Sequence, residues 1–254
     1  MAEGSASSQT QAARGIDDTR GNTESSARSP RHAAVEIAIA FGLIMAVIWT
    51  PRPAQRYLWM IAAAAVTVIT CISFDGARAM GLRGTNFVRS LWIAGAALAL
   101  AGMAVALAAT LGTLRMPHGV TAFFATYCAY AVWSGVQQFL LQCFFLLRFL
   151  RLIPNKPLAA LAASALFAVA HLPNPILAPV TLLWGFAACL HFLRYRNLYP
   201  LAIAHAILGI TLAMAIPGPV DHNMRVGLGY LTYRRHHPQA HRPYPVDSPL
   251  PKPQ

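Results

Sequence analysis

Seven stretches of apolar residues, separated by short polar segments, follow one another between residues 33 and 216. A hydrocarbon core about 30 Å thick is crossed by about 20 apolar residues in helical conformation. The pattern therefore predicts an all-α protein, a polytopic transmembrane bundle of about seven or eight helices. The predicted spans are 33–49, 57–74, 90–112, 120–147, 158–172, 176–193 and 199–216.

The two ends of the chain lack this apolar pattern. Residues 1–31 are rich in Ser, Ala, Thr, Gln and Arg and contain no hydrophobic run, so we expect a disordered polar tail and no signal peptide. Residues 217–254 contain eight prolines and a cluster of histidines, and we expect an extended Pro/His/Arg-rich tail. The bundle would then occupy residues 32–216.

The composition supports a membrane protein and excludes an ordinary soluble domain. Hydrophobic residues make up 56% of the chain and charged residues only 11%, whereas soluble domains carry about 25% charged residues. Between Ile37 and Val220 the one carboxylate is Asp75, so catalysis by paired carboxylates is not expected there. The basic residues lie scattered at the ends of apolar runs, which indicates contact with a lipid bilayer and no nucleic-acid partner.

The distribution of basic residues predicts the orientation. The loops 75–89, 148–157 and 194–198 share one side and carry eight Arg and Lys residues, against three in the opposite short loops. The positive-inside rule places the N-terminus in the cytoplasm, and we expect an integral protein of a bacterial plasma membrane. The basic residues after residue 217 conflict with seven spans, and an eighth or re-entrant segment would resolve the conflict.

Polar residues recur inside the predicted spans and mark candidate functional positions, because polar groups are costly in hydrocarbon. Ser134, Gln138 and Gln142 follow one another every four residues, so they share one helical face, and Gln137 lies beside it. The stripe must point into the bundle. Hydrogen bonding between helices explains it as well as a binding site does.

Histidines recur in the next three spans: His171 at the end of the fifth, His191 in the sixth and His205 in the seventh. A buried neutral imidazole needs both a donor and an acceptor as partners. Each histidine has a purely structural explanation. Alternatively, the histidines and the glutamine stripe converge on one polar pocket.

The order of these motifs resembles the CPBP intramembrane endopeptidases, which include the type II CAAX-prenyl proteases and bacteriocin-processing relatives. That family carries EExxxR, then FxxxH, then HxxxN or a similar ending. This chain has Gln137-Gln138-Phe-Leu-Leu-Gln142, Phe167-Ala-Val-Ala-His171 and His205-Ala-Ile-Leu-Gly209. The segments around Gly81-Leu-Arg83, Trp184-Gly185-Phe186 and Arg194-Tyr-Arg-Asn197 are also similar, and the CPBP-like core covers about residues 119–215.

The resemblance implies roles for individual residues. Gln137 and Gln138 stand at the glutamate positions and His171 at the second water-activating position, while His205 stands at the oxyanion position. Gln142, Phe167, Ser134 and His191 are implied as binding residues. The departures are two glutamines for glutamates, Gln142 for arginine and Gly209 for asparagine.

The departures alter the expected chemistry. A glutamate with a pKa of about 4.3 is a base, whereas a glutamine holds a water without taking its proton. Either His171 acts as the base while Gln137 orients the water, or the pocket no longer hydrolyses peptides. Losing the arginine together with the glutamates avoids an unpaired buried charge.

The leading hypothesis is a CAAX-type intramembrane endopeptidase that cuts membrane-anchored or prenylated peptides or proteins. The alternative is an inactive relative that binds or scaffolds a membrane peptide or lipid in the same pocket. Haem between histidines is disfavoured, because the motif order already explains His171 and His205. Those two residues are also the candidates for a divalent metal, although histidines without a carboxylate are a thin ligand set.

Overall fold

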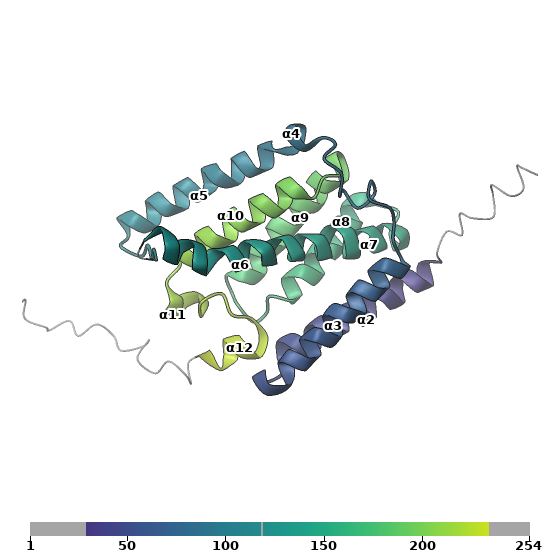
Figure 1. Ribbon diagram of the computed structural model, residues 1–254, viewed down its shortest axis with the longest axis horizontal. Helices are drawn as coiled ribbons and strands as arrows, with labels where there is room; N and C mark the ends of the chain where they lie inside the picture. The colour runs from purple at the N-terminus through teal and green to yellow at the C-terminus, as the bar shows by residue number, and fades with distance from the viewer. Residues whose placement is uncertain (1–28, 118, 234–254) are drawn as a thin grey trace, which may run out of the picture.

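The computed structural model describes residues 29–117 and 119–233, and these residues form helices without a strand (Figure 1). The first half contains α2 (Pro30–Trp49), α3 (Arg52–Ile72), α4 (Phe87–Ser90) and α5 (Trp92–Thr110). The second half contains α6 (Val120–Phe139), the π-helix η1 (Leu140–Leu146), α7 (Leu147–Leu152), α8 (Lys156–Val169), α9 (Leu177–Tyr195), α10 (Tyr199–Ala215), α11 (Gly218–Asp221) and α12 (Gly227–Leu231).

The prediction of an all-α membrane bundle is confirmed. In the described part of the chain, five helical segments are long and apolar enough to cross a membrane: α2, α3, α4 with α5, the continuous segment from α6 to α7, and α9. The remaining two predicted spans correspond to the shorter apolar helices α8 and α10. The predicted tail at residues 1–31 lies outside the described residues up to residue 28.

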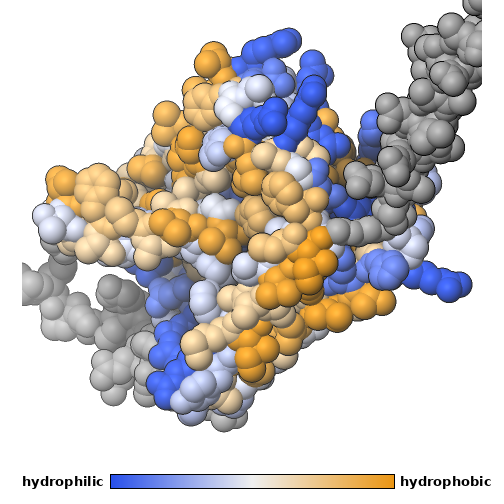
Figure 2. All heavy atoms as spheres, turned by 45° about the vertical axis from the view of Figure 1, so that its right-hand side comes forward, coloured by the Kyte–Doolittle hydropathy of each residue, from blue (hydrophilic) through white to orange (hydrophobic). Residues whose placement is uncertain are grey.

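The helices pack in two groups (Figure 1). The hairpin of α2 and α3 lies to one side, and α2 contacts α7 and α12. In the main group α10 packs between α5 and α6, and α8 packs along α9. Large apolar side chains such as Trp59, Leu98 and Leu183 are exposed, and apolar residues cover much of the face in Figure 2. Such a surface suits contact with acyl chains.

One end of the bundle is tied together by hydrogen bonds to backbone carbonyls. The buried Asn197 side chain donates to the carbonyls of Arg83 and Thr85, and the N–H of Leu198 donates to the Gly81 carbonyl. Gly81 has a φ of +66°, and a Cβ there would meet Phe192 at 2.7 Å. The segment before α4 therefore docks closely on the turn between α9 and α10.

A buried ion pair joins three elements near the same end. The Arg148 guanidinium on α7 lies 2.6 Å from a carboxylate oxygen of Glu36 on α2, and only 1% of the arginine side chain is exposed. The other oxygen of Glu36 accepts a hydrogen bond from Ser73, at the end of α3. Arg151 pairs in a similar way with Asp75. The carboxylates of Glu36 and Asp75 are thus both paired with arginines.

Helix α8 is short and ends inside the bundle. Asn155 caps its first turn by accepting from the Leu158 N–H at 3.0 Å. Fourteen residues at 1.5 Å each give about 21 Å, less than a hydrocarbon core of about 30 Å. Non-helical backbone at membrane depth is tolerated only where the protein satisfies its polar groups. The segment between α8 and α9 therefore needs partners from elsewhere in the chain.

Residues 218–231 supply those partners. The buried Asn174 amide donates to the carbonyls of Asp221 and Arg225, and the Gly227 N–H donates to the Leu172 carbonyl. Burial raises the pKa of the Asp221 carboxyl above its ordinary value of 3.8. Part of the segment that was expected to be a tail thus folds as α11 and α12 against the bundle, while residues 234–254 lie outside the described residues.

The strap, as we name residues 218–231, contains unusual backbone. Three consecutive residues, His222, Asn223 and Met224, have φ values of 53°, 54° and 56°. Left-handed conformation costs L-residues roughly 1–2 kcal/mol each. The hydrogen bonds to Asn174 and the contact of α12 with α2 hold the strap in this conformation.

The ion pair between Glu36 and Arg148 yields a stability prediction. Glu36→Gln keeps the side-chain shape but leaves the buried guanidinium without a counter-charge, so we expect a loss of about 3–5 kcal/mol. Denaturant-induced unfolding in detergent micelles measures this loss. The double variant Glu36→Gln/Arg148→Met serves as the control and should recover most of the loss; equal stability of all three proteins would contradict the prediction.

Candidate functional site

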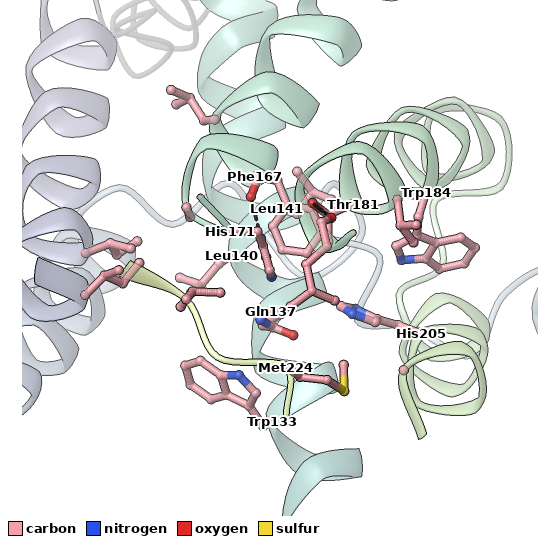
Figure 3. Close-up of a pocket in the computed structure, with 18 of the residues that line it drawn as sticks. Trp133, Gln137, Leu140, Leu141, Phe167, His171, Thr181, Trp184, His205 and Met224 are labelled. Atoms are coloured by element: carbon pink, nitrogen blue, oxygen red, sulfur yellow. Dashed lines mark hydrogen bonds between the residues drawn. The ribbon is translucent and has the colours of Figure 1, made fainter. Parts of the chain in front are cut away.

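A cavity of about 270 Å³ lies within the bundle and is lined by residues of α2, α6, η1, the end of α8, α9, α10 and the strap (Figure 3). Most of its lining is apolar. Seven of the lining residues carry polar groups: Tyr130, Trp133, Gln137, His171, Thr181, Trp184 and His205. The structure therefore brings together Gln137, His171 and His205, which the sequence places on three separate helical segments.

A chain of amide hydrogen bonds leads to His205. Gln142 donates to the Gln138 side-chain oxygen at 3.2 Å, and the Gln138 amide nitrogen lies 3.0 Å from Nδ1 of His205. An amide nitrogen only donates, so Nδ1 of His205 is an acceptor and its Nε2 carries the hydrogen. His205 is 6% exposed and lines the cavity. Its ring therefore offers a hydrogen-bond donor.

His171 has the opposite arrangement. Its Nδ1 lies 2.6 Å from the Phe167 carbonyl oxygen, one turn earlier in the chain. A carbonyl only accepts, so Nδ1 carries the hydrogen and Nε2 keeps a free lone pair. Figure 3 shows the second ring nitrogen of His171 directed toward Gln137. The ring therefore presents a hydrogen-bond acceptor to the cavity.

Aromatic contacts fix the positions of both imidazoles. The Phe167 ring lies 4.7 Å from the His171 ring and 5.9 Å from the His205 ring, edge to face in both cases. The Trp184 ring lies 6.1 Å from the His205 ring. Phe167 therefore contacts both imidazoles and helps to orient them. Gly185 permits this packing, because a Cβ there would meet Phe167 and Ser164 at 3.3 Å.

The glutamines come from a helix with a local change of geometry. Gln137 and Gln138 end α6, and Gln142 lies in the π-helix η1, in which residues 141–146 are all buried. Short π-helical segments inside α-helices occur frequently at functional sites. Gln138 and Gln142 stay one turn apart and hydrogen-bonded, while Gln137 turns to the cavity.

Other predicted site residues lie outside the cavity lining. Ser134 is buried and donates to the Tyr130 carbonyl of its own helix at 2.9 Å. The ring nitrogen Nε2 of His191 lies 3.1 Å from the Ser90 carbonyl, and its ring packs against Trp92 and Tyr195. His191 therefore links α9 to the start of α5. Gln138 and Gln142 support His205 from behind and do not line the cavity.

The described residues contain no group of three or more His, Cys, Asp or Glu side chains placed to hold a metal ion. At the cavity His171 and His205 are the candidate nitrogen ligands, and the hydrogen bond from Gln138 already occupies Nδ1 of His205. A metal site at these two residues, which the sequence suggested, stays a prediction.

Sequence reasoning missed Tyr130, Thr181 and the strap residue Met224, all of which line the cavity. Tyr130 extends the stripe of Ser134, Gln138 and Gln142 by one more step of four residues, and this spacing was the available signal. Its hydroxyl lies against Gly209: a Cβ at Gly209 would be 1.9 Å from that oxygen. Only glycine leaves room for it.

One known protein family matches part of the chain. Residues 120–211 match the family described as type II CAAX prenyl endopeptidase Rce1-like. The matched segment contains α6, η1, α7, α8, α9 and most of α10. It therefore includes the three candidate catalytic residues at the cavity, Gln137, His171 and His205. No curated protein and no solved structure matches the chain.

The apolar helices support an integral membrane protein, and residues 120–211 are similar to a family of intramembrane endopeptidases. More particularly, the match confirms the resemblance to the CPBP family, with its type II CAAX endopeptidases, over residues 120–211. Members of this class act on membrane-associated peptides within the bilayer.

The contact between Tyr130 and Gly209 yields a second stability prediction. Gly209→Ala should destabilise the protein by about 1–3 kcal/mol, because the new methyl group overlaps the phenol. The matched control is Gly102→Ala on α5, where a Cβ meets nothing within 4 Å and helix propensity favours alanine. Thermal unfolding in detergent compares the two. A Gly209 variant as stable as the Gly102 variant would show that the phenol lies elsewhere.

Proposed function

We propose that this protein is an intramembrane endopeptidase that cleaves a membrane-anchored or prenylated peptide in the central cavity. The observation that carries the proposal is the pairing of two imidazoles with opposite hydrogen positions, one acceptor and one donor, at one cavity. Hydrolysis of an amide needs a base for the attacking water and a donor for the oxyanion.

The residues divide these tasks between them. Gln137 accepts a hydrogen bond from the water and orients it, and Nε2 of His171 takes a proton as the water oxygen attacks the peptide carbonyl carbon. The N–H at Nε2 of His205 stabilises the negative oxygen. The carbon–nitrogen bond then breaks, and the His171 imidazolium returns its proton to the leaving nitrogen. The products are a carboxylic acid and an amine.

The hydrogen-bond chain behind His205 supports the donor role. An imidazole that also served as a base would need a free lone pair, but the Gln138 amide occupies the lone pair at Nδ1. Gln142 in turn holds the Gln138 oxygen and keeps the amide from rotating. The paired amides therefore act as positioning residues that fix one hydrogen position of His205.

A non-catalytic binding protein is the second candidate. The observation that favours it is the absence of a carboxylate among the residues that line the cavity in the described part of the chain. Glu36 and Asp75 are paired with arginines and do not line it. In this reading the cavity holds a peptide tail or a lipid without cleaving it.

We also propose that the end of the bundle with Arg148, Arg151 and Arg196 faces the cytoplasm of a bacterial cell. The excess of basic residues at this end supports that orientation. The N-terminal start of α2 lies at the same end, because Glu36 pairs with Arg148. The strap then lies toward the opposite membrane surface.

The first functional prediction concerns the base. Purified protein in lipid vesicles should release a fluorescent fragment from a membrane-anchored prenylated peptide. His171→Ala should lower the rate by about 10²–10⁴, the usual contribution of general base catalysis. His32→Ala, at an exposed position in the first turn of α2, is the matched control and should retain the wild-type rate. Equal rates for all three proteins would refute the assignment of His171.

The second functional prediction concerns the amide at the cavity. Gln137→Glu supplies a carboxylate base beside His171, so kcat should rise by up to about 10²–10⁴ if the wild-type rate is limited by proton removal. The same peptide release assay measures the change, and Gln137→Met, which neither accepts a proton nor holds a water, is the control. Cleavage by the glutamate variant alone would favour the binding protein as the natural function.

A further inference from the structure

We infer that Tyr130 is a second oxyanion donor of the cavity, whose phenol O–H acts together with the N–H of His205. This inference rests on the proposed peptidase function and extends it to a residue outside the three sequence motifs. The phenol comes from α6, two turns before Gln137, and lines the same cavity as Gln137 and His205.

The Tyr130 hydroxyl lies beside the turn of α10 that carries His205. It lies so close to Gly209 that a Cβ there would be 1.9 Å away. Gly209 follows His205 by one turn of α10, so the phenol oxygen occupies the space directly beside the histidine turn, where any larger residue would project a side chain. The missing side chain of Gly209 is thus replaced by a polar group from α6.

Helices α6 and α10 pack against each other in a fixed alignment. Two contacts fix their alignment: Gln138 bonds to His205, and Tyr130 packs on Gly209. The later α6 residue, Gln138, contacts the earlier α10 residue, His205, whereas Tyr130 contacts the later Gly209. The two helices are therefore antiparallel. The four-residue stripe of Tyr130, Ser134, Gln138 and Gln142 therefore runs along α10, and its first member lies beyond His205.

The other cavity-lining hydroxyl, on Thr181, and the indole of Trp184 are not available to a ligand as donors. The Thr181 hydroxyl donates to the carbonyl oxygens of Leu177 and Ala178 in its own helix. The indole Nε1 of Trp184 is buried without a partner and has no accessible surface through which a ligand could reach it. Tyr130 remains as the hydroxyl donor beside His205.

The chemical consequence is a pair of donors from two helices. As water attacks, charge develops on the carbonyl oxygen, and preorganised donors stabilise it most in a site of low dielectric constant. A phenol O–H donates without needing to ionise, which suits a site that contains no carboxylate in its lining. Loss of one such donor usually lowers kcat by about 10²–10³.

The test compares Tyr130→Phe with Tyr127→Phe, which removes a hydroxyl from the same helix one turn earlier and outside the cavity. Peptide cleavage by Tyr130→Phe should fall about 10²-fold in kcat with little change in KM, while Tyr127→Phe cleaves like the wild type. Both variants keep the aromatic ring, so thermal unfolding should stay unchanged. A loss that appears in KM or in stability instead would assign Tyr130 a packing role and overturn the inference.

A binding measurement separates this inference from the proposed function. The probe is a phosphinate peptide, whose tetrahedral anion mimics the intermediate, measured against the matching amide peptide. Tyr130→Phe should weaken phosphinate binding about 10²-fold and amide binding less than about 2-fold. If the wild type cleaves no peptide but this difference persists, hydrolysis is refuted and the donor role stands. Equal phosphinate binding by both proteins, or binding by neither, overturns the donor role.

Discussion

The hydrogen bond between the Gln138 amide and Nδ1 of His205 is the interaction on which the site depends. Hydrocarbon offers no partners, so each polar group inside the bundle must find one in the protein. The amide of Gln138 satisfies the imidazole and is itself held by Gln142. These two hydrogen bonds connect the end of α6 and the π-helix η1 to α10. They hold Gln138 and His205 at the same depth in the bundle.

The same requirement explains how charge is distributed in the molecule. The carboxylates Glu36 and Asp75 lie at the arginine-rich end, where Arg148 and Arg151 neutralise them. The polar groups that line the otherwise apolar cavity are, by contrast, one amide, two imidazoles, two hydroxyls and two indoles. A buried charge without a partner is far more costly than a hydrogen-bonded neutral group. Gln137 at the cavity and the hydrogen-bonded Gln138 and Gln142 behind it supply polar groups without adding a charge.

The sequence predicted much of the fold because membrane thickness sets the length of apolar helices. The seven apolar stretches correspond to seven helices, and Gln137, His171 and His205 lie at one cavity as their motifs suggested. The ring hydrogens, the π-helix and the contact of Tyr130 with Gly209 depend on partners distant in sequence, which periodicity does not encode. The strap was missed for another reason: its prolines and histidines suggest a solvated tail, but its backbone groups satisfy those of the short α8–α9 connection.

The left-handed backbone of the strap makes one wall of the cavity differ from the others in what holds it in place. Helices form the other walls, and opening them would separate extended packed surfaces. Met224 and Val226 form the remaining wall, which belongs to a segment whose own conformational preference opposes its folded shape. A few hydrogen bonds to Asn174 and Leu172 outweigh that preference. Among the walls of the cavity, the strap is therefore the one whose shape is set by partners elsewhere in the chain and not by its own backbone preference.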